Sequence, residues 1–350
     1  MFSFANKSKG FCVEIGEHNA LVARLSQNEA PILVEELKEL PLSDNEAVVD
    51  YIRQMEGKGP TGYAMAKCGV YPPRRVIRRQ TLDLKRVKDP TYFNEILAQQ
   101  FRIEPEKYTV RILNSSDGSE YDAIKASQKE VLFCGVPSDD INSTQDKLLE
   151  MGVYPECLEL STVATLGAMV DYLSFKQSKA PVLLLEIGAD LTQSFILSAD
   201  GIEISRPIPS GTAAMIPVVL KELGLKDEES AKKLFYSNTF DFTSMGPMLI
   251  RKLIKELQSS IGFYEVQTGQ SIGSVLCAQL PTNLGWLGST MAGALGVPQF
   301  KMDFLPWLEA KGIRLADGVA SGPLDERWIG LFALMATYNN GVPANTVEKK

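Results

Sequence analysis

Cysteine, histidine and long apolar runs are scarce in this chain of 350 residues. The five cysteines are an odd number with no repeated spacing, which argues against a disulfide framework or a zinc site and predicts reduced core thiols. The single histidine, His18, argues against a serine–histidine–aspartate triad. No run reaches about 18 apolar residues, and the N-terminus lacks the regions of a signal peptide. The sequence therefore predicts neither a membrane span nor export.

Positive charge is also in short supply. The formal net charge is −7, which argues against general nucleic-acid binding, because such binding needs a basic surface. No P-loop sequence is present. Apolar residues make up 45% of the chain, enough for a large core, and the length predicts two or more domains. We therefore expect a cytoplasmic protein of several domains with no nucleic-acid partner.

The most informative feature that is present is an internal repeat. The segments Val13-Glu14-Ile15-Gly16 and Leu185-Glu186-Ile187-Gly188 stand 172 positions apart (186 − 14). In each, an apolar run ends in an acid and a glycine, and a polar turn leads to a second apolar run, as in a β-hairpin. Glycine lets backbone N–H groups approach a phosphate, and the acid can hold Mg²⁺ through water. The repeat predicts a duplicated fold of the kind that clamps phosphates between two lobes.

Strand and helix patterns alternate along the remaining sequence, which favours an α/β fold with helices on both faces of mixed sheets. The prolines after Tyr71 mark a break, and we expect a small α+β insert over 72–152 that includes a strand at 121–126. The other predicted units are a first lobe (1–71, 153–179 and 325–350), a second lobe (180–220 and 268–324) and a helical subdomain (221–267) with one long helix at 247–267. We predict a final helix over 325–338. The segment 300–323 lacks periodicity, so it either packs against the second lobe or forms a surface arm that pairs with another subunit.

Several segments, taken in order, resemble the PilM branch of the actin-like ATPase superfamily, close to FtsA. They are VLFCGVPSDDINSTQDKLLEMGVYPECLELSTVATLGAMV, VLLLEIGADLTQSFILSADGIEISRPIPSG and IKELQSSIGFYEVQ. The resemblance covers nearly the whole chain, from Gly10 to about Asn340. It implies an actin-like, ribonuclease H-like fold of two lobes, 1A and 2A, with a helical 2B-like subdomain. It also implies that the insert is of the 1C type, which replaces the usual subdomain of actin.

The resemblance also implies a role. Members of this branch are cytoplasmic proteins of type IV pilus or type II secretion platforms at the inner membrane. They grip the N-terminal cytoplasmic tail of a bitopic partner, PilN, in a groove beside the insert. The resemblance therefore implies peripheral attachment to the inner face of the membrane through a PilN-like partner. Self-association stays open.

One basic segment stands out from the acidic background. Between Lys67 and Lys88 the charges sum to +7 (8 − 1). A strand predicted at 74–82 would carry its arginines on both faces, and our hypothesis is that they flank the partner groove. The alternatives are contact with anionic lipids and a solvated edge strand that its charges protect from aggregation. The predicted partner-binding residues are Arg74, Arg75, Arg78 and Arg79.

The two hairpin loops depart from the nucleotide motifs of the family. Active members carry Asp-x-Gly followed by serine or threonine, whereas the acids here are glutamates and each loop adds another carboxylate. Two like charges about 4 Å apart repel by roughly 1 kcal/mol in water and about 4 kcal/mol at an effective dielectric near 20. Neither loop has a lysine or arginine, and Cys277-Ala278-Gln279-Leu280-Pro281 replaces the glycines of the adenosine motif. We expect a vestigial cleft without catalytic residues or cofactor, formed by Glu14, Gly16, Glu17, Glu186, Gly188, Asp190, Ser259, Ala278 and Gln279.

Two alternatives remain for this cleft. A working ATPase switch or a kinase of the same superfold would need an intact phosphate cradle and an acid near the γ-phosphate. The sequence offers candidates only for the acid. Binding of ATP with Mg²⁺ is thus the minor expectation, as is a cation held by the loop acids, because hard cations accept clustered carboxylates. The simpler interpretation is that the acids line a solvated cleft and hold no metal.

Overall fold

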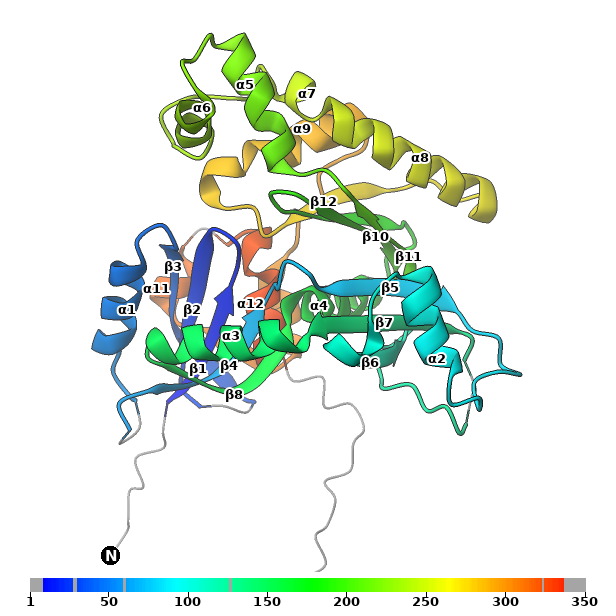
Figure 1. Ribbon diagram of the computed structural model, residues 1–350. Helices are drawn as coiled ribbons and strands as arrows, with labels where there is room; N and C mark the ends of the chain where they lie inside the picture. The colour runs from blue at the N-terminus through cyan, green and yellow to red at the C-terminus, as the bar shows by residue number, and fades with distance from the viewer. Residues whose placement is uncertain (1–8, 28–29, 59–60, 126–127, 323, 337–350) are drawn as a thin grey trace, which may run out of the picture.

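The computed structural model describes residues 9–27, 30–58, 61–125, 128–322 and 324–336. Two lobes stack on one another, and a smaller sheet lies beside the lower lobe (Figure 1). The three sheets have the strand orders β13-β3-β2-β1-β4-β8, β11-β10-β9-β12 and β5-β7-β6. The α/β two-lobe architecture predicted from the sequence is therefore confirmed. The ends of the first-lobe assignment, 1–8 and 337–350, lie outside the described residues.

The first lobe is built on the six-stranded sheet. Its antiparallel part consists of β1 (Gly10–Ile15), β2 (Asn19–Leu25) and β3 (Ile32–Pro41). Two parallel strands, β4 (Ala64–Val70) and β8 (Val153–Leu160), complete one side. Both faces are covered by helices, so these strands are apolar at consecutive positions. The helices are α1 (Asn45–Gln54) and α3 (Ser138–Glu150) on one face, and α4 (Ser161–Phe175) and α12 (Ile329–Met335) on the other.

The second lobe repeats this plan. Its sheet consists of β9 (Val182–Ile187), β10 (Thr192–Ser198) and β11 (Gly201–Ile208), which are antiparallel, and β12 (Ser274–Ala278), which is parallel to β9. The two hairpin turns close in the same way. The N–H of Gly16 donates to the carbonyl of Asn19 at 2.9 Å, and the N–H of Gly188 donates to that of Leu191 at 3.0 Å. The predicted duplication is thus present at the level of single hydrogen bonds.

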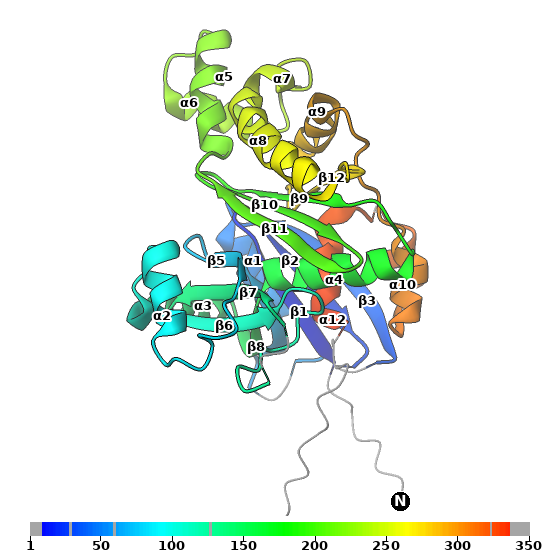
Figure 2. The ribbon, with the colours of Figure 1, turned by 90° about the vertical axis from the view of Figure 1, so that its right-hand side faces the viewer.

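Helices cover the outer face of the second sheet, while α4 lies between the two sheets (Figure 2). The helix predicted at 247–267 is interrupted at Ile250, and the sequence analysis did not identify α6. The helices of this layer are α5 (Ile216–Glu222), α6 (Glu228–Phe235), α7 (Gly246–Leu249), α8 (Arg251–Thr268) and α9 (Trp286–Leu295).

The insert is a three-stranded antiparallel sheet with one short helical segment. It contains β5 (Val76–Thr81), α2 (Tyr92–Glu95), β6 (Tyr108–Asn114) and β7 (Glu130–Pro137). The strand predicted at 121–126 is wrong for 121–125, where Asp122 instead accepts the N–H of Ile124 at 2.9 Å in a turn. Residue 126 lies outside the described part. Helix α3, assigned to the insert from the sequence, packs on β8 and buries Leu148 in the first-lobe core.

The segment 300–323 belongs to the first lobe, not to the second as predicted. It forms α10 (Phe304–Ala310), β13 (Ile313–Leu315) and α11 (Asp317–Ala320), and β13 pairs with β3. Figure 2 shows α10 beside β3. Trp307 is fully buried and donates to Asp171 of α4 at 2.8 Å, so the segment is not a free surface arm. A strand of three residues is too short for periodicity to indicate. The predicted end of the final helix, Tyr338, lies outside the described residues.

Candidate functional site

The two hairpin turns face a cavity of about 530 Å³ between the lobes. Most of the predicted cleft residues line it, whereas Glu14 lies behind it and Ala278 is buried in β12. Ser259 is not part of the cleft: it is exposed on α8, and the neighbouring Ser260 is the buried one. Adjacent helix positions point about 100° apart, so a shift of one residue changes the face. The predicted residues that line the cavity are Gly16, Glu17, Glu186, Gly188, Asp190 and Gln279.

Glu14 is a buried acid that Tyr71 holds by a hydrogen bond. Its side chain is 2% exposed, and the Tyr71 hydroxyl donates to Oε1 at 2.7 Å. Burial raises the pKa of Glu14 to about 7, although the Tyr71 hydrogen bond lowers it in part. Burial likewise raises the pKa of Tyr71 well above its usual value, so the hydroxyl stays a donor. At neutral pH Glu14 is divided between its protonated and ionised forms. The sequence analysis missed Tyr71.

Glu186 forms a buried ion pair with Arg75 of the insert. Its Oε2 accepts from Arg75 Nη2 at 2.8 Å and from the hydroxyl of Thr162 at 2.7 Å. The side chains of Arg75 and Glu186 are 11% and 2% exposed. Arg75 Nε also donates to the Thr162 hydroxyl at 2.8 Å. Arg75, predicted to contact a partner, therefore belongs to the cleft, because the turn before β5 points it between the lobes.

Glu17 crosses the cleft to the second hairpin turn. Its carboxylate oxygens accept the backbone N–H of Ala189 at 3.1 and 3.3 Å. Ala189 occupies the position equivalent to Glu17 in the repeat, 172 residues later. A Cβ at Gly188 would lie 3.1 Å from Glu17 Oε2 and 3.0 Å from the carbonyl of Leu191. The glycine therefore gives the carboxylate room to approach the backbone. The sequence predicted only repulsion among these acids and did not indicate this contact.

The other three predicted arginines have separate partners. Arg74 forms an ion pair with Asp140, and Arg79 pairs with Glu130 at 2.9 Å. Arg78 donates to the carbonyl of Ile77 at 3.4 Å, and burial lowers its pKa to about 10. The outer edge of β5 is covered as well, because the Ser205 hydroxyl of β11 donates to the Ile77 carbonyl at 2.6 Å. Strand β5 therefore cannot add an extended peptide at this edge, and the four arginines do not form one patch.

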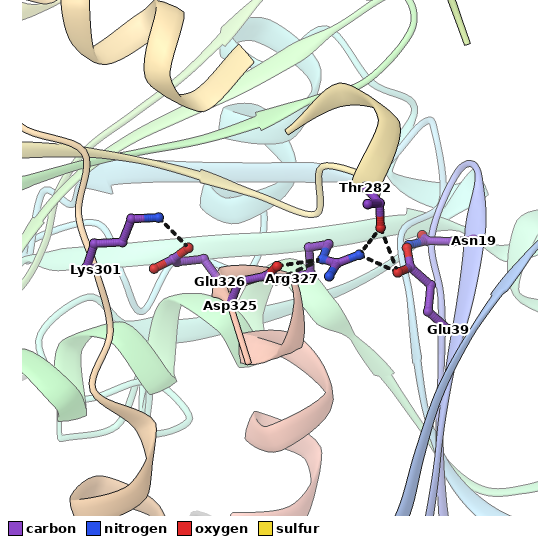
Figure 3. A network of polar contacts seen from close by, with 7 residues as sticks. All are labelled: Asn19, Glu39, Thr282, Lys301, Asp325, Glu326 and Arg327. Atoms are coloured by element: carbon purple, nitrogen blue, oxygen red, sulfur yellow. Dashed lines mark hydrogen bonds and ion pairs between the residues drawn. The ribbon is translucent and has the colours of Figure 1, made fainter. Parts of the chain in front are cut away.

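A further polar network joins the lobes at the loop after β12. Arg327 contacts Glu39 of β3, Asp325 and Thr282, and Thr282 donates to Glu39 Oε2 at 3.1 Å (Figure 3). Asn19 donates to the other oxygen of Glu39 at 2.8 Å. Thr282 follows β12, whereas Glu39 and Arg327 belong to the first lobe. The sequence analysis did not identify this network, because its members are far apart in the chain.

A second cavity, of about 380 Å³, lies between the first lobe and the insert. We call it the insert groove. Two of its walls come from edge strands, since β6 ends the insert sheet and β8 ends the first-lobe sheet. Thr109, Arg111 and Glu159 supply polar groups. The apolar side chains that line it include Val70, Leu113, Val136, Ile141, Leu158, Leu160 and Val163.

Metal ligands and membrane spans were also sought in the described residues. No group of three or more histidine, cysteine, aspartate or glutamate side chains is placed to hold a metal ion. None of the helices in that part of the chain is both long enough and apolar enough to cross a bilayer. All five cysteines are unpaired, and four are buried; Cys157 on β8 is exposed.

Comparison with solved structures identifies an actin-like fold. The structure described as a PilM-PilN type IV pilus biogenesis complex is similar with a TM-score of 0.64 and 16% identity, over 93% of this chain and 97% of that chain. A Bacteroides thetaiotaomicron protein with an actin-like ATPase fold and unknown function has a TM-score of 0.44 and 8% identity, over 96% and 98%. The cytoplasmic domain of EpsL, an inner-membrane component of the Vibrio cholerae type II secretion system, has a TM-score of 0.39 and 8% identity, over 94% of each chain.

Sequence comparisons add nothing to this. No family model matches the chain. No curated protein matches it either. At 16% identity the first similarity shows a shared fold, which agrees with the actin-like fold predicted from the sequence.

Proposed function

We propose that this protein is a scaffold on the cytoplasmic side of a pilus-like or secretion-like inner-membrane assembly. In this role it holds the short cytoplasmic tail of a PilN-like bitopic membrane protein and is attached to the membrane through that partner. The observation that carries the proposal is the insert groove, an apolar cavity of about 380 Å³ in a fold shared with a pilus biogenesis complex. The groove is the ligand site, and the interlobe cleft is not.

An extended tail suits the construction of this groove. Strands β6 and β8 each have a neighbour on one side only, so each offers a backbone edge to an added strand. Apolar side chains such as Ile141 and Leu160 would bury alternate side chains of the tail. Arg111 and Glu159 supply charges of both signs for its polar groups. A short tail with alternating apolar residues is thus the ligand that the groove favours.

Nucleotide binding has no part in the proposed role. A triphosphate would have to displace the Glu17 carboxylate from the N–H of Ala189. A metal ion would have to compete with Arg75 for Glu186. Gln279, where the family has glycine, projects its side chain into the cavity wall. These residues do not fit a magnesium nucleotide, and we propose that the protein is not an enzyme.

The groove proposal predicts the effect of Ile141→Glu. Ile141 lines the insert groove from the first turn of α3, so a carboxylate there would lose its hydration when an apolar tail binds. We expect at least about a tenfold rise in Kd, equivalent to about 1.4 kcal/mol. The measurement is fluorescence anisotropy with a labelled peptide of the cytoplasmic tail of the bitopic protein that copurifies with the tagged chain.

Phe263→Glu is the matched control. Phe263 is 59% exposed on α8, in the other lobe, so its replacement introduces the same charge away from the groove. Binding should be unchanged in this variant. Equal affinity of the Ile141 and Phe263 variants for the tail would contradict the assignment of the groove.

A further inference from the structure

Glu17 occupies the position that an anion would take in the second hairpin turn. A backbone N–H beside a glycine forms a concave anion site, because no Cβ obstructs the approach. Here the N–H of Ala189 and the open side of Gly188 form that site, and the Glu17 carboxylate fills it at 3.1 and 3.3 Å. Such a charge-assisted hydrogen bond is stronger than one between neutral groups. The occupant comes from the opposite lobe, so the contact joins the two lobes.

Arg75 supplies the complementary cation. The guanidinium lies 2.8 Å from Glu186, the acid that ends β9, and is held over the ring of Tyr71 at 5.4 Å. It also binds the hydroxyl of Thr162 at the start of α4. A single side chain of the insert therefore contacts both the second lobe and the helix between the lobes. Thr162 precedes Val163, which lines the insert groove.

We infer that Glu17 and Arg75 are built-in substitutes for the phosphate and the metal ion of a magnesium nucleotide, and that they hold the lobes and the insert together in the free protein. The carboxylate joins the two hairpin turns, and the guanidinium joins the insert to the second lobe. The insert groove is then set in its binding geometry without any ligand in the cleft. This inference rests on the proposed loss of nucleotide binding and adds the means by which closure is achieved.

The contact across the cleft can be tested by hydrogen exchange on the full chain. Glu17→Ser removes the carboxylate that accepts the Ala189 N–H. We expect amide exchange in peptides that contain Ala189 to become at least about tenfold faster, because the N–H loses its acceptor and the turns separate. The radius of gyration from X-ray scattering should increase in parallel. If Glu17→Ser does not fold, Glu17→Gln keeps an acceptor oxygen without the charge, and exchange should still be faster than in the unaltered protein.

Asp190→Ser is the matched control. Asp190 is an exposed acid of the same cleft and makes no hydrogen bond or ion pair with the other described residues. Its replacement removes the same charge, and exchange at Ala189 should not change. Unaltered exchange in the Glu17 variants, or equal acceleration in the Asp190 variant, would overturn the inference. Neither outcome affects tail binding by the unaltered protein, so the proposed function would stand or fall separately.

Discussion

Replacing Arg75 with alanine should lower the free energy of unfolding by about 3–5 kcal/mol, because it leaves the buried carboxylate of Glu186 without its counter-charge. Glu186 is 2% exposed, and its Oε1 already lacks a hydrogen-bond partner within the described part of the chain. Arg75 also provides two hydrogen bonds that involve Thr162 and the carbonyl of Pro72. Urea unfolding followed by circular dichroism measures the difference. No other single replacement discussed for this cleft is expected to cost as much.

Two comparisons separate the burial of charge from the loss of an arginine. Arg79→Ala removes a more exposed ion pair, that with Glu130, and should cost no more than about 1 kcal/mol. Adding Glu186→Gln to Arg75→Ala should recover most of the lost stability, because the neutral amide does not need a cation. A loss in Arg75→Ala no larger than that in Arg79→Ala would show that Glu186 is not held as an unpaired buried charge.

The second large effect is a dependence of stability on pH that originates at Glu14. Its pKa rises from 4.5 to about 7 on folding, so the folded state holds the proton more tightly than the unfolded state. This contribution is complete below the unfolded pKa and is lost as the pH rises through about 7. Between about pH 5 and about pH 8 the loss should be about 2–3 kcal/mol.

Glu14→Gln should remove this part of the pH dependence. The amide oxygen can still accept the Tyr71 hydroxyl, and the side chain cannot ionise. The variant should therefore be more stable than the unaltered protein at alkaline pH and similar to it at acidic pH. Urea unfolding across the pH range provides the comparison. Parallel curves for the two proteins would show that Glu14 does not titrate in this window.

The hairpins could be predicted from sequence because both of their determinants are local. An apolar run, an acid, a glycine and a polar turn define each one, and the 172-residue spacing defines the pair. The turns formed by Gly16 and Gly188 follow directly from this pattern. In the same way, Asp44 caps α1 as the sequence indicated, through the N–H of Ala47 at 3.0 Å. Local hydrogen bonds of this kind depend only on neighbouring residues.

The partners of the cleft acids could not be predicted, because they depend on how distant segments meet. The sequence indicated that Glu17 and Glu186 carry excess negative charge, but not that a backbone N–H and Arg75 would neutralise it. Arg75 was grouped with its neighbours in one basic strand, although β5 begins only at Val76. Its direction is set by the preceding prolines and the position of the insert. Tyr71 was missed because a tyrosine at a chain break carries no signal of its contact with Glu14.

A titration of Mg-ATP against the unaltered protein, followed by melting temperature, tests the central claim most directly. The claim is that the protein's own side chains already satisfy the cleft, so the melting temperature should not change up to millimolar nucleotide. Ligand at about 100 times its Kd would add roughly 2.7 kcal/mol of stability, an effect that a thermal melt detects easily. A clear, saturable rise in melting temperature with Mg-ATP would contradict the account.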